Sequence, residues 1–495
     1  MGQLSQPEDR RVLITVAVLL GTFLTAVDTT IVSTAMPTVV GELGGMRIYS
    51  WVFSAYLLTS TVTVPIYGRL ADIHGRKPLF LVGSAIFVAG SMLAGVSRSM
   101  PELIAFRALQ GLGAGAVQPI TQTIIGDIFT AAQRARMQGL FSSVWGVSAV
   151  LGPGLGGFLV QYVSWRWIFF INLPFGLASA LLLSLALRER LEHHRHPLDW
   201  PGIGALSLGL TALLFALLEG GSALPWTSRP VLGLLAGAAV LLVAFILQER
   251  RAADPVLPLE LLSRPVLAVA NAAGFLSGWL MLGINSFVPL FVQGVLRGTP
   301  TAAGAAVAAM AVGWPVGSIL GGRLLPRIGH RALAVAGGVV LVAGALLVAA
   351  LAPSSSAALP ELAVGLVGLG LGFSTLAMII VVQHSVPWRE RATATASTQF
   401  FRTVGGAVGV AALGGLLNAS LAGAPLAGKV SLERLLLPGA TMSAGARAAL
   451  AGALMGGLHR LFWVLPPLAL LTLAVSIFLP HLPPGEPPEQ ARPGT

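Results

Sequence analysis

An acidic residue, Asp28, lies in the middle of a stretch that is otherwise apolar or hydroxyl-bearing, FLTAVDTTIVSTAMP at residues 23–37. The apolar segment around it is long enough to cross the hydrocarbon of a bilayer. A carboxylate at that depth costs about 2.5 kcal/mol or more, so something must compensate for it. Burial favours the neutral acid, whereas a nearby cation such as Arg107 favours the carboxylate. A carboxyl balanced between these effects can take up and release a proton.

Two interpretations of Asp28 follow from this balance. If a cationic solute and a proton compete for the carboxyl, inward proton flow can drive outward solute flow. The alternative is a structural acid whose oxygens accept hydrogen bonds from Thr25 or Thr29. The partners of Asp28 in the folded chain distinguish the two.

Composition places this chain in a membrane. Of its 495 residues 55% are hydrophobic and only 10% charged, with a mean hydropathy of +0.83, whereas soluble domains average about 25% charged residues. The net charge is +11, but the Arg residues lie in short gaps between apolar runs, which excludes a nucleic-acid surface. The chain has no cysteine, so disulfides and thiolate metal sites are excluded, and no metal site is expected.

Apolar stretches of about twenty residues predict roughly fourteen membrane spans. An excess of Lys and Arg in the gaps on one side predicts that both termini are cytoplasmic. Residues 421–457 form a gap that predicts an extracellular hairpin or interfacial segment. The predicted spans lie near residues 12–36, 49–69, 78–97, 101–125, 134–161, 165–187, 201–219, 230–248, 265–294, 301–322, 331–351, 360–384, 393–420 and 458–479.

An internal repeat organises these spans. GRLADIHGRK at 68–77 aligns with GRLLPRIGHR at 322–331, and the same spacing places Gly152 on Gly406. Parallel repeats of this kind place a transport pathway at their interface. The expected domains are an N-terminal six-helix bundle (1–190), an inserted helix pair with cytoplasmic linkers (191–255), a C-terminal six-helix bundle (256–482) and a disordered cytoplasmic tail (483–495).

The loop GRLADIHGRKP at 68–78 contains paired charges between two glycines. Gly68 and Gly75 permit a tight turn and a close helix approach. Asp72 and Arg76 lie four residues apart and can pair on a helix. This string resembles the signature loop of the major facilitator superfamily.

The resemblance extends over most of the chain, to the fourteen-span drug:proton antiporter branch of that superfamily. It implies an all-α membrane protein with the major facilitator fold, made of two six-helix bundles plus an inserted two-helix pair, with 14 transmembrane helices. The motifs that carry it are AVDTTIVSTAMP at 26–37, RALQGLGAG at 107–115, GPGLGG at 152–157, WRWIFFINLPFG at 165–176 and QFFRTVGGAVGVA at 399–411.

The resemblance also implies residue roles. Asp28 matches the acidic position of the first span, and Arg107 the arginine linked to proton movement. Asp72 and Arg76, with Asp127, match the residues that hold the inner gate closed, together with Gly68 and Gly75 of the loop. In the second half Pro326 replaces the acid, so an asymmetric gate is expected. The antiporter motif comprises Gly152, Pro153, Gly156 and Gly157, whose glycines allow tight helix contact and whose proline lets the helix bend.

Polar and aromatic residues within the spans are candidates for a substrate cavity, although such residues also serve as packing. Few acids lie within the spans of the second half, which favours monovalent cationic or neutral lipophilic substrates. The candidates are Tyr56, Gln110, Trp145, Asn285, Phe287 and Gln399.

The expected function is proton-coupled export of lipophilic cationic or neutral drugs by alternating access across the inner or plasma membrane, without a cofactor and as a monomer. The expected partners are small lipophilic molecules, protons and the bilayer, and no nucleic acid. A dedicated exporter of a single lipid, antibiotic or metabolite is the first alternative. An intramembrane enzyme is disfavoured because H-E-x-x-H, G-x-S-x-G and thiols are absent. A structural scaffold is disfavoured by the charges of Asp28 and Arg107.

Overall fold

Helices account for nearly all of the regular structure of the chain. The computed structural model describes residues 8–44, 48, 51–189, 199–220, 224–252, 255–298, 300–422 and 444–480, and these contain no named strand. A helix satisfies its own backbone groups, as an element surrounded by lipid must. The helices are α1 (Glu8–Leu43), α2 (Trp51–His74), α3 (Arg76–Gly95), α4 (Met100–Ile128), α5 (Ala131–Tyr162), α6 (Trp167–Phe170), α7 (Asn172–Ala186), α8 (Trp200–Glu219), α9 (Arg229–Glu249), α10 (Leu259–Ser263), α11 (Pro265–Gly294), α12 (Pro300–Ala349), α13 (Ala358–Ser385), η1 (Trp388–Glu390), α14 (Arg391–Ala422), α16 (Ala444–Phe462) and α17 (Leu465–Ile477).

The all-α membrane architecture expected from the sequence is confirmed. Among the described residues, 11 helical segments are long and apolar enough to cross a membrane. One of them, Ala302–Ala349, covers two of the predicted spans. The predicted spans near 49–69 and 101–125 correspond to α2 and α4, which are not among the 11 and which carry buried polar side chains. The count of fourteen spans therefore stays a prediction.

The internal repeat is visible in the backbone. Gly75, between α2 and α3, has φ 95° and ψ 161°, and Gly329, inside α12, has φ 79° and ψ 171°. The two glycines hold equivalent places in the aligned loops at 68–77 and 322–331. Glycine adopts this positive-φ conformation without the steric cost of a Cβ atom. Gly329 divides α12 into two helices, as the loop at Gly75 separates α2 from α3.

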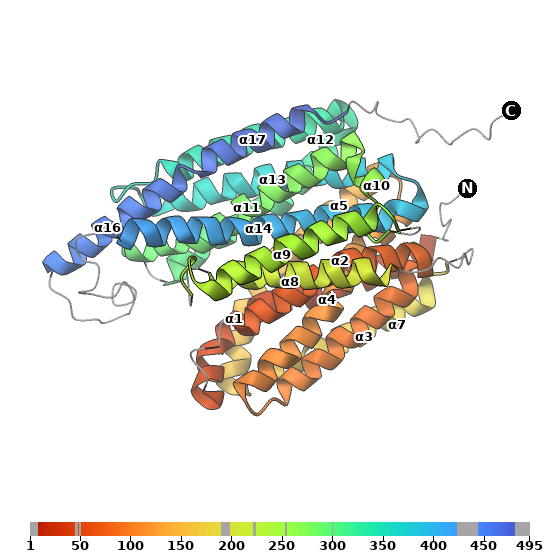
Figure 1. Ribbon diagram of the computed structural model, residues 1–495, viewed down its shortest axis with the longest axis horizontal. Coiled ribbons are helices and arrows are strands. Elements are labelled where there is room, and N and C mark those ends of the chain that lie inside the picture. Colours follow the sequence, from red (N-terminus) through yellow and green to blue (C-terminus); the bar gives the residue numbers. More distant parts are fainter. Residues whose placement is uncertain are drawn as a thin grey trace.

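The most extensive contacts between the first half of the chain (α1–α7) and the second half (α11–α17) are made by two helix pairs related by the repeat. These pairs are α2 with α14 and α5 with α12. A Cβ added at Gly68 would lie 2.5 Å from Ala396 Cβ, and one at Gly146 would lie 2.7 Å from the Ala311 carbonyl. Figure 1 shows the two halves close together at the end where α1 begins and diverging at the end where α1 and α14 finish.

The helices of the predicted insertion, α8 and α9, pack against each other, and α8 also contacts α2 and α14. Leu206 and Leu210 of α8 share a hydrophobic cluster with Val62 of α2 and Phe400 of α14. The pair therefore covers one junction between the halves. The domain boundaries expected from the sequence stay a prediction.

Several expectations fall on residues that the structure does not describe. Of the predicted hairpin or interfacial segment at 421–457, residues 423–443 lie outside the described residues, and the stretch from residue 444 onward belongs to helix α16. Most of the linker after residue 190 and the predicted tail at 483–495 also lie outside them.

The positive φ angles at the two loop glycines generate a stability prediction. Replacing Gly75 or Gly329 by Ala forces a Cβ into the left-handed region, so each variant should lose roughly 1–2 kcal/mol of stability. Thermal unfolding of the purified chain in nanodiscs measures this loss. Gly304→Ala is the matched control, because Gly304 is helical and a Cβ there meets nothing within 4 Å. A melting temperature unchanged by both loop substitutions would contradict the strain argument.

Candidate functional site

Asp28 is fully buried and paired with Arg107. Arg107 Nη1 donates to Asp28 Oδ2 at 2.5 Å, and the exposed fractions of the two side chains are 1% and 0%. Gln110, one turn along α4, donates through Nε2 to Asp28 Oδ1 at 2.8 Å and accepts from Arg107 Nη1 at 2.7 Å. The ion pair and its amide partner therefore form a closed polar cluster in an apolar setting, which lowers the cost of burying both charges.

Three further residues complete this Asp28 cluster. Asn172 at the start of α7 donates through Nδ2 to Asp28 Oδ1 at 3.1 Å and to Ser91 Oγ of α3 at 2.9 Å. The guanidinium carbon of Arg107 lies 4.3 Å from the ring centroid of Tyr56. Among all residues of the Asp28 cluster, Tyr56 and Gln110 were predicted to lie near a cavity, whereas Asn172 and Ser91 were not predicted as site residues. Asn172 lies within the motif WRWIFFINLPFG, which was the only signal in the sequence.

The structural alternative for Asp28 named the wrong partners. Thr25 donates to the carbonyls of Gly21 and Thr22, and Thr29 donates to the carbonyl of Ala26. Both threonines therefore satisfy the backbone of their own helix, as hydroxyls in helices commonly do. The carboxylate is instead held by groups from other helices.

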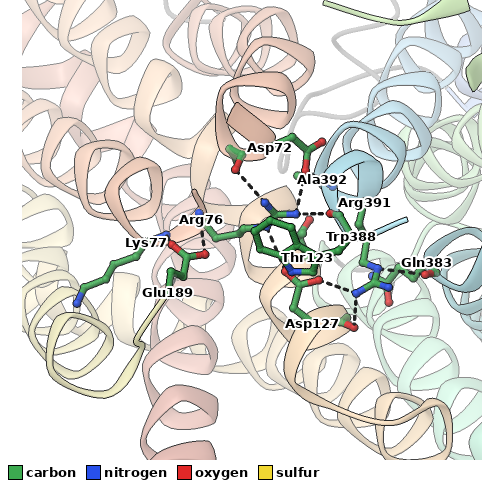
Figure 2. A network of polar contacts seen from close by, with 12 residues as sticks. Asp72, Arg76, Lys77, Thr123, Asp127, Glu189, Gln383, Trp388, Arg391 and Ala392 are labelled. Carbon is green, nitrogen blue, oxygen red and sulfur yellow. Dashed lines mark hydrogen bonds and ion pairs between the residues drawn. The ribbon is translucent and has the colours of Figure 1, made fainter. Parts of the chain in front are cut away.

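The second site joins the charged residues of the loop at 68–78. Arg76 Nη2 lies 2.9 Å from Asp72 Oδ1, and Arg76 Nε lies 3.1 Å from Asp127 Oδ2 at the end of α4. All three side chains are at most 2% exposed. The pairing of Asp72 with Arg76 that their spacing predicted is confirmed. Figure 2 shows Arg76 between the two acids.

Asp72 also bonds to the other half of the molecule. Its carboxylate accepts from the backbone N–H groups of Ala392 and Thr393 at 3.1 and 2.7 Å, and from the Thr393 hydroxyl at 2.7 Å. These amides belong to the first turn of α14, where N–H groups have no partner within the helix and the helix dipole favours a negative charge. Asp72 of the first half therefore caps a helix of the second half.

Arg391 makes the second connection between the halves. Its Nη1 lies 2.7 Å from Asp127 Oδ1 and donates to the Gly126 carbonyl, while its Nε donates to the Gln383 carbonyl (Figure 2). Arg76 in turn donates to the Trp388 carbonyl at 2.7 Å and lies over the Trp388 ring. The name gate network is used below for Asp72, Arg76, Asp127, Arg391 and Thr393, after the role that the resemblance implies for the first three. The partners from 388 to 393 were not identified from the sequence.

Burial dominates the electrostatics of the gate network. It raises the pKa of Asp72 to about 6, although Arg76 and the hydrogen bonds from Thr393 and Ala392 act in the opposite direction. Burial also raises the pKa of Glu189, whose carboxylate accepts from the backbone N–H groups of Arg76 and Lys77. Burial and the bonding partners of Asp72 therefore act on its pKa in opposite directions.

The equivalent positions of the second half carry no ion pair. The alignment that pairs Gly75 with Gly329 places His330 at the position of Arg76, and Pro326 at that of Asp72. His384 precedes the last residue of α13, as Asp127 precedes the last residue of α4. The rings of His330 and His384 lie 6.0 Å apart, and both nitrogens of His330 are buried without a partner. The two loops therefore differ in their charged groups, and the asymmetry of the gate stays a prediction.

The antiporter motif lies in α5, beside α1. A Cβ at Gly152 would clash with the Thr30 side chain, so the close contact expected there is confirmed. Gly156 is buried, and Pro153 lies within the helix. At Gly157 a Cβ would meet nothing within 4 Å, so the expectation of tight packing is wrong there because that face of the helix is exposed.

The remaining cavity candidates lie apart from the Asp28 cluster. Trp145 is half-buried on α5, and Phe287 belongs to the hydrophobic core of the second half. Asn285 Oδ1 is buried without a partner, and Gln399 accepts a hydrogen bond from Arg402. Phe287 thus serves packing, whereas Asn285 and Gln399 hold polar groups in the second half. Across the described ranges, no group of three or more His, Asp or Glu side chains could hold a metal ion.

Comparison with known proteins identifies the family. The sequence pattern of the Major Facilitator Superfamily matches residues 18–410 of the chain. The chain is 37% identical over 412 residues to the multidrug transporter protein MdtP of Bacillus subtilis, covering 83% of this chain and 76% of that protein. It is 35% identical over 401 residues to multidrug resistance protein 3 of the same organism, covering 81% and 78%.

A solved structure shares the fold. The human organic anion transporter MFSD10 superposes with a TM-score of 0.62 at 17% sequence identity, covering 94% of this chain and 100% of that one. At that identity the likeness concerns the fold alone. The family match covers residues 18–410, and 11 helical segments of the described chain could span a membrane. The chain therefore belongs to the Major Facilitator Superfamily and is a multi-pass membrane transporter.

Proposed function

We propose that this transporter exports lipophilic drugs in exchange for protons, as in the fourteen-span drug:proton antiporter branch, and that Asp28 carries the proton. The observation that carries the proposal is the fully buried Asp28–Arg107 pair. An ionisable pair inside a membrane protein marks an ion or proton pathway more often than a structural element. The names of the two Bacillus subtilis relatives support drugs as the substrate class.

Protonation of Asp28 would remove the charge that holds Arg107. Arg107 would keep Gln110 and the Val52 carbonyl as partners but would lose its carboxylate. Arg107 shares α4 with Asp127, about 30 Å away along the helix. A displacement of α4 that follows protonation would therefore also act on the gate network. In this proposal the proton site and the gate network share one helix, which suits a two-state transition between conformations.

The gate network would close the cytoplasmic side. The basic residues predict that the end where α1 begins is cytoplasmic. At that end the two halves are bonded through Asp72, Asp127 and Arg391. In this proposal the structure corresponds to an outward-facing state, in which substrate has left and a proton is taken up from outside.

Asp28→Asn tests the coupling role, because it keeps hydrogen-bonding capacity but cannot release a proton. Gradient-driven transport of ethidium and tetraphenylphosphonium into inside-out proteoliposomes should fall at least about tenfold, the scale expected for a missing proton-transfer group. Asp28→Glu should retain part of the activity, and the exposed Glu102→Gln serves as the control. Undiminished gradient-driven transport by Asp28→Asn would refute the role of Asp28.

A wider panel of solutes tests the alternative of an exporter dedicated to a single compound. Transport of only one solute of that panel would favour this alternative.

The raised pKa of Asp72 gives the gate a defined pH dependence. The closed gate holds this carboxyl with a pKa of about 6, and solvent access on opening returns the pKa toward about 3.9. The closed state then binds the proton more tightly than the open state. Closure is therefore favoured as pH falls from about 6 toward about 4. This stabilisation of the closed state is lost as pH rises through about 6. Between pH 7 and pH 5 the ratio of closed to open should rise about tenfold.

Distances between spin labels would measure this equilibrium. The chain has no native cysteine, so labels at the exposed residues His74 and Arg327 report on the two halves directly. The Asp72→Asn variant should lose the pH response, whereas Glu361→Gln, at an exposed acid, should keep it. A shift toward the open state on acidification would show that the sign of the linkage is wrong.

A further inference from the structure

Arg402 places a guanidinium group inside the second half of the transporter. It lies roughly 16 Å along α14 from the gate residue Arg391, near the middle of the predicted span. Its Nη2 donates to Gln399 Oε1, one turn earlier on the same helix. Its guanidinium carbon lies 5.6 Å from the ring centroid of Trp314 on α12. The two partners of this cation are therefore neutral.

Two other buried arginines are compensated by carboxylates. Arg107 pairs with Asp28, and Arg76 pairs with Asp72 and Asp127. Throughout the described part of the chain, no carboxylate pairs with Arg402. An uncompensated cation at membrane depth is costly, so an anion from outside the chain would be bound favourably.

Arg402 also has free donors that can reach such an anion. A guanidinium carries five N–H donors, and only the bond to Gln399 uses them here. Its Nε and Nη1 make no hydrogen bond to the described residues, so both are free to donate to a ligand. These donors form a planar fork that matches a carboxylate.

The surroundings of Arg402 suit a lipophilic ligand. Trp314 presents its ring to the guanidinium, and it packs against the hydrophobic core of the second half. Trp279 of α11 packs on α14 at Gly409, and its indole Nε1, a donor only, is buried without a partner. Trp314 therefore supplies aromatic surface beside the guanidinium, and Trp279 lies about 10 Å further along α14. An apolar wall with a few oriented polar groups is typical of small-molecule sites.

We infer that Arg402 and Trp314 form a subsite for the carboxylate of a lipophilic organic acid. This inference rests on the proposed function, whose substrate class it refines. It adds amphiphilic anions to the cationic and neutral substrates expected from the scarcity of acids in the second half. Asp28 and Arg402 then serve different ligands, the proton in the first half and the acidic group of the solute in the second.

Equilibrium binding of two ligands of nearly equal shape tests the inference. The probes are 4-biphenylacetate and 4-biphenylacetamide at neutral pH, titrated calorimetrically into the full chain in nanodiscs, with empty nanodiscs as the blank. The wild type should bind the carboxylate at least about tenfold more tightly than the amide, the scale of one charge-assisted hydrogen bond. Equal affinities, or no detectable binding of the carboxylate, would overturn the inference without recourse to any variant.

Substitutions test whether Arg402 causes the preference for the carboxylate over the amide. Arg402→Gln should weaken carboxylate binding about tenfold and leave amide binding within about twofold. Arg402→Lys should fall between the two because it keeps the charge and loses the fork. Arg323→Gln removes an exposed arginine of α12 and should bind like the wild type. An undiminished preference for the carboxylate in Arg402→Gln would place the anion elsewhere and refute the subsite.

This binding experiment is independent of proton coupling. Loss of gradient-driven transport in Asp28→Asn, with an intact carboxylate preference, would support both proposals. An intact preference in a wild-type chain that shows no gradient-driven transport would overturn the antiport mechanism and keep the subsite.

Discussion

The need to neutralise charge inside the membrane is the constraint on which the arrangement of the first half depends. Asp28 and Arg107 are acceptable at that depth only as a pair, and removing one partner of such a pair costs about 3–5 kcal/mol. The pair requires α1 and α4 to lie together, and Asn172 brings α7 to the same point. The polar cluster therefore sets the relative positions of helices whose apolar faces alone would pack in several ways.

The gate network applies the same physics at the boundary between the halves. Asp72 pairs with Arg76 within its own half and at the same time caps α14 of the other half. When the halves separate, the amides of α14 and the carboxylate can both be hydrated, whereas the Asp28 cluster is enclosed within the first half. This difference supports the separate roles proposed for the two clusters, proton binding for the first and a conformational switch for the second.

The sequence was sufficient for the features that repeat or that lie close together along the chain. The aligned loops predicted equivalent glycines, and Gly75 and Gly329 share the same backbone conformation. The spacing of Asp72 and Arg76 predicted their pairing. Contacts between distant segments were not predictable, because capping of α14 by Asp72 and the bond from Asn172 to Asp28 depend on how helices are placed. The resemblance supplied residue roles but not these partners, and it gave Gly157 a contact it does not make.

The histidines of the second half bear on how the two copies of the gate loop have diverged. Both copies carry the same turn, yet one has two acids and an arginine, and the other has His330 in place of the arginine and His384 at the end of α13. A substitution in the first copy leaves a buried charge unpaired, whereas one in the second copy removes no ion pair. The first copy should therefore tolerate substitution less well than the second.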